Sequence, residues 1–201
     1  MFVQVMRGHV TDAEQVHAAL DQWSRELGPE APGWLGSTAG VTEDGEFVGL
    51  ARFESAEAAR RNSDRPEQSD WWSNLSRLFT TDISVRDSDD VMVDINGDPD
   101  DARFVQIMQG RGTDPERAKE LMEQNPEEWA AYRPDVIGSI AADQSSGEYT
   151  VALYFTSEQA AREGEKKEPP PELKAQMDEM EKLNIGEPEF LDLKNPWLYS
   201  S

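Results

Sequence analysis

Histidine and cysteine, which often carry acid–base, nucleophilic and metal chemistry, are scarce or absent in this 201-residue chain, so such chemistry would depend on two histidines or on carboxylates. The chain contains two histidines, His9 and His17, and no cysteine, so thiolate nucleophiles, disulfides and cysteine-bound metal centres are excluded. Neither histidine belongs to a cluster with the spacing of metal ligands. His9 ends an alternating segment and His17 lies beside the apolar positions of a helical segment, so surface or boundary roles are expected for both. No metal site is predicted.

The sequence also lacks the motifs of several large enzyme classes. It has no Gly-x-Ser-x-Gly elbow, no glycine-rich phosphate loop and no dinucleotide fingerprint. The 41 acidic residues must bring some carboxylates together by number alone, which does not indicate glycosidase or metal chemistry. A net charge of -22 repels phosphate backbones and anionic lipid. No catalytic residue is assigned, and neither nucleic acid nor a membrane is an expected partner.

No apolar run approaches the roughly 20 residues of a membrane-spanning helix, and the first residues do not read as a secretion signal. A cytoplasmic location is the default expectation for such a chain.

The chain repeats itself with a constant shift. The phrase FVQVMRGHVTDAEQ at Phe2 returns as FVQIMQGRGTDPER at position 104, a shift of 102 positions, and FESAEAAR at Phe53 returns as FTSEQAAR. The two copies align without a gap up to Ile83, which falls on Ile185. This regularity indicates a tandem duplication, with repeats at 1–97 and 102–201 and a connector at Asn96–Ala102.

Each repeat is predicted to contain the elements β-α-β-β-α-β. In the first repeat, alternating residues predict strands at 2–9, 34–41 and 46–54, and a last strand within 83–95. Helical spacing follows Thr11-Asp12 and Ser55, both suitable helix caps. This order is the ferredoxin-like unit, a four-stranded antiparallel sheet with its helices on one face. The predicted fold class is α+β, with two tandem units whose sheets cover each other as an intramolecular dimeric α/β barrel.

The phrases FVQVM, ARFESAEAARR and NSDRPEQSDWW resemble those of the dimeric α/β-barrel superfamily, and within it the antibiotic-biosynthesis monooxygenase-like group. The resemblance covers both halves, and it implies that one chain forms the pair that members usually form as homodimers. Members include cofactor-independent oxygenases of polycyclic phenols, haem-degrading oxygenases, haem peroxidase-like enzymes and small isomerases. The fold therefore does not choose the activity.

The haem-degrading branch can be tested by position. Its asparagine, tryptophan and histidine would fall on Met6, Asn62 and Trp72, and none of the three is retained. The second repeat carries Met108, Gly164 and Lys174 at these places. Haem degradation is not expected, and no cofactor is predicted.

The two repeats differ in their second helical region. Trp72 and Phe79 of the first repeat become Lys174 and Glu181 in the second. Trp72 and Phe79 are seven residues apart, so they lie on one line of a helix and need a non-aqueous neighbour. This row either packs on a loop or another subunit, or it lines a pocket.

A pocket at this place would combine apolar walls with a few polar groups, as small-ligand sites do. The resemblance implies an aromatic substrate that loses a proton before its anion reacts with oxygen, so Arg52, Asn62 and a tryptophan N–H are candidates to hold the anion. The candidate pocket residues are Gln4, Met6, Arg52, Asn62, Trp71, Trp72 and Phe79.

The favoured function is binding of a small aromatic or apolar molecule, with cofactor-independent monooxygenase-like activity left open. The alternative is a non-catalytic protein of the same fold whose Trp72–Phe79 row is an oligomer contact, so that further homo-oligomers form.

Overall fold

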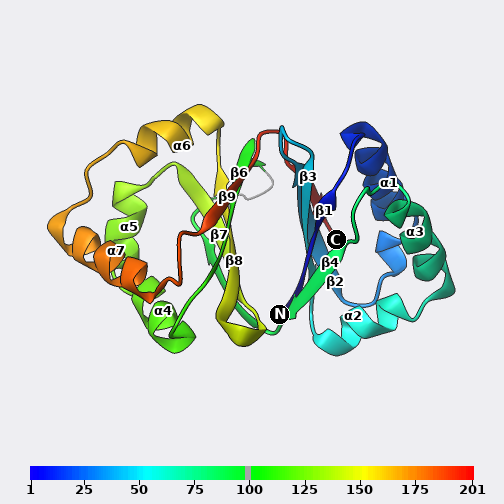
Figure 1. The fold of residues 1–201 in the computed structure, drawn as a ribbon, viewed down its shortest axis with the longest axis horizontal. Helices are drawn as coiled ribbons and strands as arrows, with labels where there is room; N and C mark the ends of the chain where they lie inside the picture. The colour runs from blue at the N-terminus through cyan, green and yellow to red at the C-terminus, as the bar shows by residue number, and fades with distance from the viewer. Residues whose placement is uncertain (98–100) are drawn as a thin grey trace. The chain divides into compact units, whose positions relative to one another are not determined.

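The computed structural model describes residues 1–97 and 101–201, which form two compact units. Unit 1 comprises Met1–Val91 and Asn195–Ser201, and unit 2 comprises Met92–Lys194. Each unit has a five-stranded sheet with helices on one of its faces (Figure 1). The predicted α+β class with two tandem ferredoxin-like units is confirmed. The predicted connector at Asn96–Ala102 lies partly outside the described residues.

The sheet of unit 1 has the strand order β10-β2-β3-β1-β4. Its strands are β1 (Phe2–His9), β2 (Trp34–Val41), β3 (Glu46–Phe53), β4 (Ser84–Ser88) and β10 (Trp197–Ser200). Its helices are α1 (Ala13–Glu26), α2 (Ala56–Ser63) and α3 (Pro66–Ser76), with a short 3₁₀ turn, η1, at Gly28–Glu30.

Two of the three helices of unit 1 begin at the caps that the sequence predicts. The Asp12 carboxylate accepts a hydrogen bond from the Gln15 backbone N–H at 3.0 Å, which caps α1. The Ser55 hydroxyl accepts from the Ala58 N–H at 3.2 Å and caps α2. Pro66 opens α3, where its missing N–H costs no helical hydrogen bond. The caps and Pro66 thus set where the three helices begin.

Strand register decides which side chains of unit 1 face the helices. Met6 of β1 pairs with Gly49 of β3 on one side and with Val85 of β4 on the other. Because side chains alternate along a strand, Phe47, Gly49 and Ala51 share the helix-facing side with Met6. The core under the helices is built on this face.

The sheet of unit 2 has the strand order β5-β7-β8-β6-β9. Its strands are β5 (Asp90–Ile95), β6 (Phe104–Arg111), β7 (Val136–Asp143), β8 (Glu148–Phe155) and β9 (Glu189–Leu193). Its helices are α4 (Pro115–Met122), α5 (Pro126–Tyr132), α6 (Glu158–Glu165) and α7 (Pro171–Leu183), with a 3₁₀ turn, η3, at Ser145–Gly147.

The first helical region of unit 2 is divided, whereas its counterpart α1 is continuous. Asn125 adopts a left-handed conformation with φ 53°, and Pro126 opens the next helix. Proline inside a helix removes a backbone donor and clashes with the preceding turn. The equivalent position in α1 is Ser24, which leaves that helix intact.

The end strands of the two repeats are exchanged. The sequence predicts one strand within 83–95, but the structure has two there: β4 completes the sheet of unit 1, and β5 pairs beside β7 in unit 2. In the same way, β10 follows β9 in the chain but pairs beside β2 in unit 1. The prediction of four-stranded sheets was therefore wrong, and both sheets have five strands. Each repeat has one additional strand after its fourth, and this strand pairs with an edge strand of the other repeat. The ranges 1–97 and 102–201 describe the duplication, and the compact units have different ends.

Candidate functional site

Unit 1 contains a cavity of about 320 Å³ between the helix-facing side of its sheet and its helices. Strands β1, β2, β3, β4 and β10 form the floor and edges, and α1, α2 and α3 form the roof. The lining is mainly aromatic and aliphatic: Met6, Leu20, Trp23, Ala39, Phe47, Gly49, Leu50, Ala51, Phe53, Trp71, Trp72, Leu75, Phe79, Ile83, Val85 and Tyr199. The polar lining residues are Gln4, Ser37, Thr38, Asn62, Ser63, Gln68 and Ser69.

The structure brings six of the seven candidate residues to this cavity. They are Gln4, Met6, Asn62, Trp71, Trp72 and Phe79. Arg52 is not among the lining residues. It lies on β3 between Ala51 and Phe53, which line the cavity, so alternation directs its side chain to the opposite face of the sheet. Arg52 is therefore not placed to hold an anion in this cavity.

Asn62 supplies a buried polar group to the cavity wall. Its side chain is 4% exposed, and its Oδ1 accepts a hydrogen bond from the Arg65 guanidinium at 3.1 Å. Arg65 also donates to the Leu27 carbonyl at 3.2 Å, so Asn62 is held from outside the cavity. Within the described residues, its Nδ2 amide has no protein acceptor. The Oδ1 side of the amide is thus engaged by Arg65, and the Nδ2 group makes no hydrogen bond within the described residues.

The three tryptophans of the lining differ in how their indole N–H groups are used. Trp23 donates to the Gln68 side chain at 2.6 Å, and Trp71 donates to the Ala19 carbonyl at 3.1 Å. The Trp72 N–H has no protein acceptor in the part of the chain that the structure describes. Of the three, Trp72 is therefore the one whose indole N–H makes no hydrogen bond to the described part of the chain. Hydrogen bonds hold the rings of Trp23 and Trp71 in place.

The cavity is electrically neutral inside a strongly acidic chain. None of its lining residues among those described carries a formal charge, although the chain has a net charge of -22. The one titratable lining group is the Tyr199 phenol, whose pKa is raised by burial and by its hydrogen bond to Asp21. The phenol is therefore protonated at neutral pH. An uncharged ligand fits such a site, because an unpaired buried charge is costly.

The two histidines lie outside the cavity lining. His9 lies 3.8 Å from the Glu46 carboxylate and His17 lies 3.5 Å from that of Asp21. In residues 1–97 and 101–201, no cluster of three or more acidic or histidine side chains could hold a metal ion.

Sequence reasoning missed several lining residues. Gly49 and Ala51 could have been found, because they share the alternating face of Phe47 and Phe53 on a predicted strand. Tyr199 could not have been placed, because the second repeat carries it at its end and only the strand exchange brings it to unit 1.

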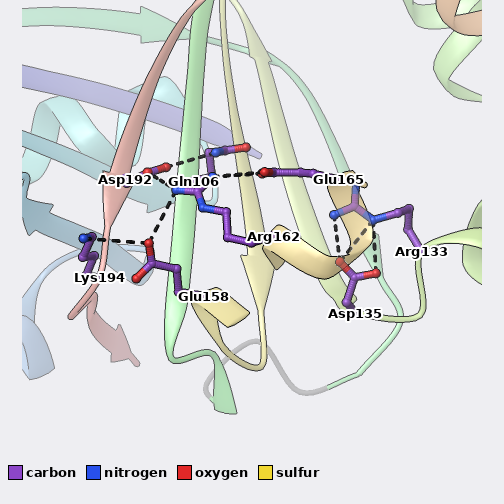
Figure 2. A network of polar contacts seen from close by, with 8 residues as sticks. All are labelled: Gln106, Arg133, Asp135, Glu158, Arg162, Glu165, Asp192 and Lys194. Carbon is purple, nitrogen blue, oxygen red and sulfur yellow. Dashed lines mark hydrogen bonds and ion pairs between the residues drawn. The ribbon is translucent and has the colours of Figure 1, made fainter. Parts of the chain in front are cut away.

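Unit 2 has a network of ion pairs around its α6 helix. Figure 2 shows Arg162 of α6 reaching toward Asp192 of β9, with Glu158 and Glu165 beside it. Gln106 donates to the Asp192 carboxylate at 3.0 Å. Each of these charges is thus matched by an opposite charge or a hydrogen-bond donor.

A second ion pair of unit 2 stands where unit 1 has Asn62. Gly164 is the counterpart of Asn62, and a Cβ atom built on it would lie 2.5 Å from the Asp135 carboxylate. That carboxylate is paired with Arg133 at 2.7 Å (Figure 2). The ion pair therefore takes the space that a side chain at position 164 would need.

No family model matches the chain, and neither does any curated protein. Solved structures, however, are similar to it over its length. Two carry the name putative monooxygenase: that of Lactobacillus acidophilus covers 98% of this chain and 98% of its own at 12% identity and a TM-score of 0.74. That of Fusobacterium nucleatum covers 100% and 94% at 10% identity and a TM-score of 0.77. The chain has their fold.

A third similar structure is an anthrone oxidase-like protein, which covers 100% of this chain and 92% of its own at 14% identity and a TM-score of 0.67. The resemblance inferred from the sequence is thus confirmed for the fold. At such identities the likeness concerns the fold, and the activity must be argued from the site. None of the helices in the described ranges has the length and apolar character needed to cross a bilayer.

Proposed function

We propose that the unit 1 cavity binds a small, uncharged aromatic or apolar molecule. The observation that carries this proposal is the lining itself, which is aromatic and free of charged residues among those described, in a chain that is 30% charged. Its volume of about 320 Å³ is within the range of small-molecule sites. We also propose a cytoplasmic location, which is the default for a chain of this composition.

We further propose that the bound molecule is oxidised by O₂ without a cofactor, as a monooxygenase-like reaction. A phenolic ring system with an activated CH₂ group suits this chemistry: the CH₂ becomes C=O with one oxygen atom. The second oxygen atom leaves as water with the two hydrogens of the CH₂ group. The ligand is thereby the reductant, and O₂ is the oxidant.

We propose that two groups of the lining stabilise the charge that forms in this reaction. The Asn62 amide and the Trp72 indole N–H can donate to a ligand oxygen as it becomes an anion, which lowers the energy of that anion. Within the described lining there is no carboxylate, imidazole or amine to accept the proton. The proton must therefore go to water, and the rate should rise with pH through the pKa of the ligand itself.

The lack of a basic group on the described lining also favours a second candidate, which is binding without turnover. Such a protein would carry or sense an aromatic molecule. In the oligomer hypothesis, by contrast, Trp72 and Phe79 are covered by another subunit instead of facing a ligand.

Two measurements test the proposal. Calorimetric titration should show that neutral 2-naphthol binds at least about tenfold more tightly than anionic 2-naphthoate, since no lining cation pairs with the carboxylate. Oxygen uptake with 1,8-dihydroxyanthrone then separates turnover from binding alone. If neither naphthalene compound binds, the ligand proposal fails.

Trp72→Ala distinguishes the cavity from an oligomer contact. We expect this variant to lose 2-naphthol binding and to keep its mass by light scattering, while Trp129→Phe in unit 2 changes neither. A fall in mass with unchanged binding would favour the oligomer hypothesis.

A further inference from the structure

The last residues of the chain form part of the unit 1 cavity. Strand β10 pairs beside β2, with Trp197 opposite Ala39 and Tyr199 opposite Ser37. Residues two apart on a strand point to the same face, so Trp197 and Tyr199 both face the helices. Tyr199 is a lining residue of the cavity, and Trp197 packs in the core beside it.

Helix α1 holds both of these aromatic rings. The Tyr199 hydroxyl donates to the Asp21 carboxylate at 2.8 Å. One helical turn earlier, His17 stacks on Trp197, with ring centroids 4.5 Å apart and planes 4° apart. His17 also lies 3.5 Å from the same oxygen of Asp21. We call His17, Asp21, Trp197 and Tyr199 the terminal clasp.

The clasp determines what Tyr199 presents to a ligand. Because its hydroxyl is directed to Asp21, the phenol oxygen is engaged outside the cavity, and the aromatic ring forms the wall. A ring held at one end by a hydrogen bond and carried on a paired strand loses little further freedom when a ligand binds. A fixed wall limits the size of the ligand more sharply than a mobile one.

The clasp belongs to the unit that has this cavity and is not repeated in the other. Strand β9 pairs with β6 as β4 pairs with β1, and residues of β9 are the counterparts of residues of β4 that are 105 positions earlier. By the same shift, the unit 2 counterpart of Tyr199 is Asp94, and that of Trp197 is Met92. On the first helical region, Lys119 and Glu123 stand for His17 and Asp21. An acidic residue at the place of Tyr199 cannot form an apolar wall. The clasp therefore accompanies the neutral cavity.

We propose that Tyr199 is a specificity-determining residue of the unit 1 cavity and that Asp21 is its positioning residue. The ring of Tyr199 closes the cavity on the side of β10 and sets the largest fused aromatic system that enters. This inference rests on the proposed binding function. It assigns to the end of the second repeat a role in the site of unit 1.

The test compares two neutral phenols of different size, 2-naphthol with two rings and 9-phenanthrol with three. Tyr199→Ala should raise the affinity for 9-phenanthrol relative to 2-naphthol by about tenfold, as expected when about 1.4 kcal/mol of steric cost is removed. Tyr199→Phe retains the ring, so its affinity ratio should stay within about threefold of the wild type. The same titrations with Tyr132→Phe in unit 2 give a matched control that should resemble the wild type.

Asp21 is tested by conservative and disruptive changes. Asp21→Asn keeps an oxygen that accepts from the Tyr199 hydroxyl, so the affinity ratio should remain that of the wild type. Asp21→Leu removes the acceptor, and the ratio should move toward that of Tyr199→Ala. Loss of folding alone would weaken both ligands together and leave the ratio unchanged.

The possible failures can be told apart. If the wild-type protein binds neither phenol, the proposed function is wrong. If it binds them and a natively folded Tyr199→Ala protein keeps the wild-type ratio, the function stands and the role of Tyr199 is wrong. Far-UV circular dichroism shows whether the variant is folded, and Tyr199→Leu provides a second apolar replacement if the alanine variant is not.

Discussion

The sheets of the two units have equivalent strand orders, but the side chains on their helix-facing sides differ in size. On β3 of unit 1 this side carries Gly49 and Ala51, whereas the equivalent residues of β8 in unit 2 are Val151 and Leu153. The small residues leave room on the floor of the cavity. The larger residues of unit 2 extend from its sheet into the corresponding space.

The residues that the units share serve the sheet. Gln4 donates to Asp87 at 3.0 Å in unit 1, and Gln106 donates to Asp192 at 3.0 Å in unit 2. Both hydrogen bonds join the first strand of a repeat to its neighbouring edge strand. Because both units have this hydrogen-bonded pair, it is explained by the fold that they share and does not indicate a ligand.

The residues that differ change the chemistry under the helices. Unit 1 has Trp72 where unit 2 has Lys174, which pairs with Asp178 at 3.3 Å. Unit 1 has Asn62 with an available donor where unit 2 has Gly164 against an ion pair. At these two places unit 1 carries uncharged side chains, and unit 2 carries or adjoins charged ones.

Replacing the floor of unit 1 with that of unit 2 should have the largest effect. Gly49→Val with Ala51→Leu should weaken 2-naphthol binding more than tenfold, since overpacking costs about 1–3 kcal/mol at each site. A Cβ atom at Gly49 would already lie 3.0 Å from the Phe47 ring. Calorimetric titration measures the loss.

The reciprocal change is the control for this experiment. Val151→Gly with Leu153→Ala in unit 2 should leave 2-naphthol binding unaltered. A filled unit 1 that stays folded and binds 2-naphthol as the wild type does would show that the ligand lies elsewhere.

Asn62→Leu should have an intermediate effect that depends on the ligand. Leucine keeps the approximate size but removes the Nδ2 donor, together with the Oδ1 acceptor that Arg65 uses. 2-Naphthol should therefore bind about three- to tenfold more weakly, as expected for one neutral hydrogen bond. Naphthalene has no hydroxyl group and should bind as before. Equal losses for both ligands would mean that Asn62 acts through packing alone.

Arg162→Gln should affect unit 2 and spare the cavity. Arg162 pairs with Glu158, Glu165 and Asp192, and its side chain is 34% exposed. Removing these partly exposed pairs should lower the free energy of unfolding by about 1–2 kcal/mol. Urea denaturation measures this change. Any loss of 2-naphthol binding in the folded variant would link the network to the site of unit 1.

The smallest effect concerns alkaline pH. Burial and the hydrogen bond to Asp21 raise the pKa of Tyr199 above its unfolded value of about 10. Its contribution to stability is therefore complete below about pH 10 and is lost as the pH rises further. The difference in free energy of unfolding between the wild type and Tyr199→Phe should shrink above about pH 10 in urea titrations. A constant difference up to about pH 11.5 would contradict the burial of this phenol.

The fold could be predicted from the sequence because each element has a local sequence pattern and the same patterns occur in both repeats. The structure contains the strand that alternation predicts at Phe2–His9 and the helix that the cap at Asp12 predicts. It also contains the two similar units that the 102-residue shift predicts. The exchange of β5 and β10 could not be predicted. An edge strand pairs through its backbone groups, so its side chains do not indicate which strand it pairs with.

The site could be predicted in part. Trp72 and Phe79 were indicated by the contrast between repeats, and both line the cavity. The charge of Arg52 favours it as an anion-binding group, but strand alternation directs its side chain to the other face of the sheet. Tyr199 depends on a long-range strand pairing that no local pattern records.

A crystal structure of the wild-type chain soaked with 2-naphthol tests the central claim most directly. The account predicts electron density for one naphthol in unit 1, in the cavity lined by Asn62, Trp72, Phe79 and Tyr199, with its hydroxyl within hydrogen-bond distance of the Asn62 amide or the Trp72 indole N–H. Density for the ligand only in unit 2 or on the outer surface, with this cavity closed by side chains, would contradict it.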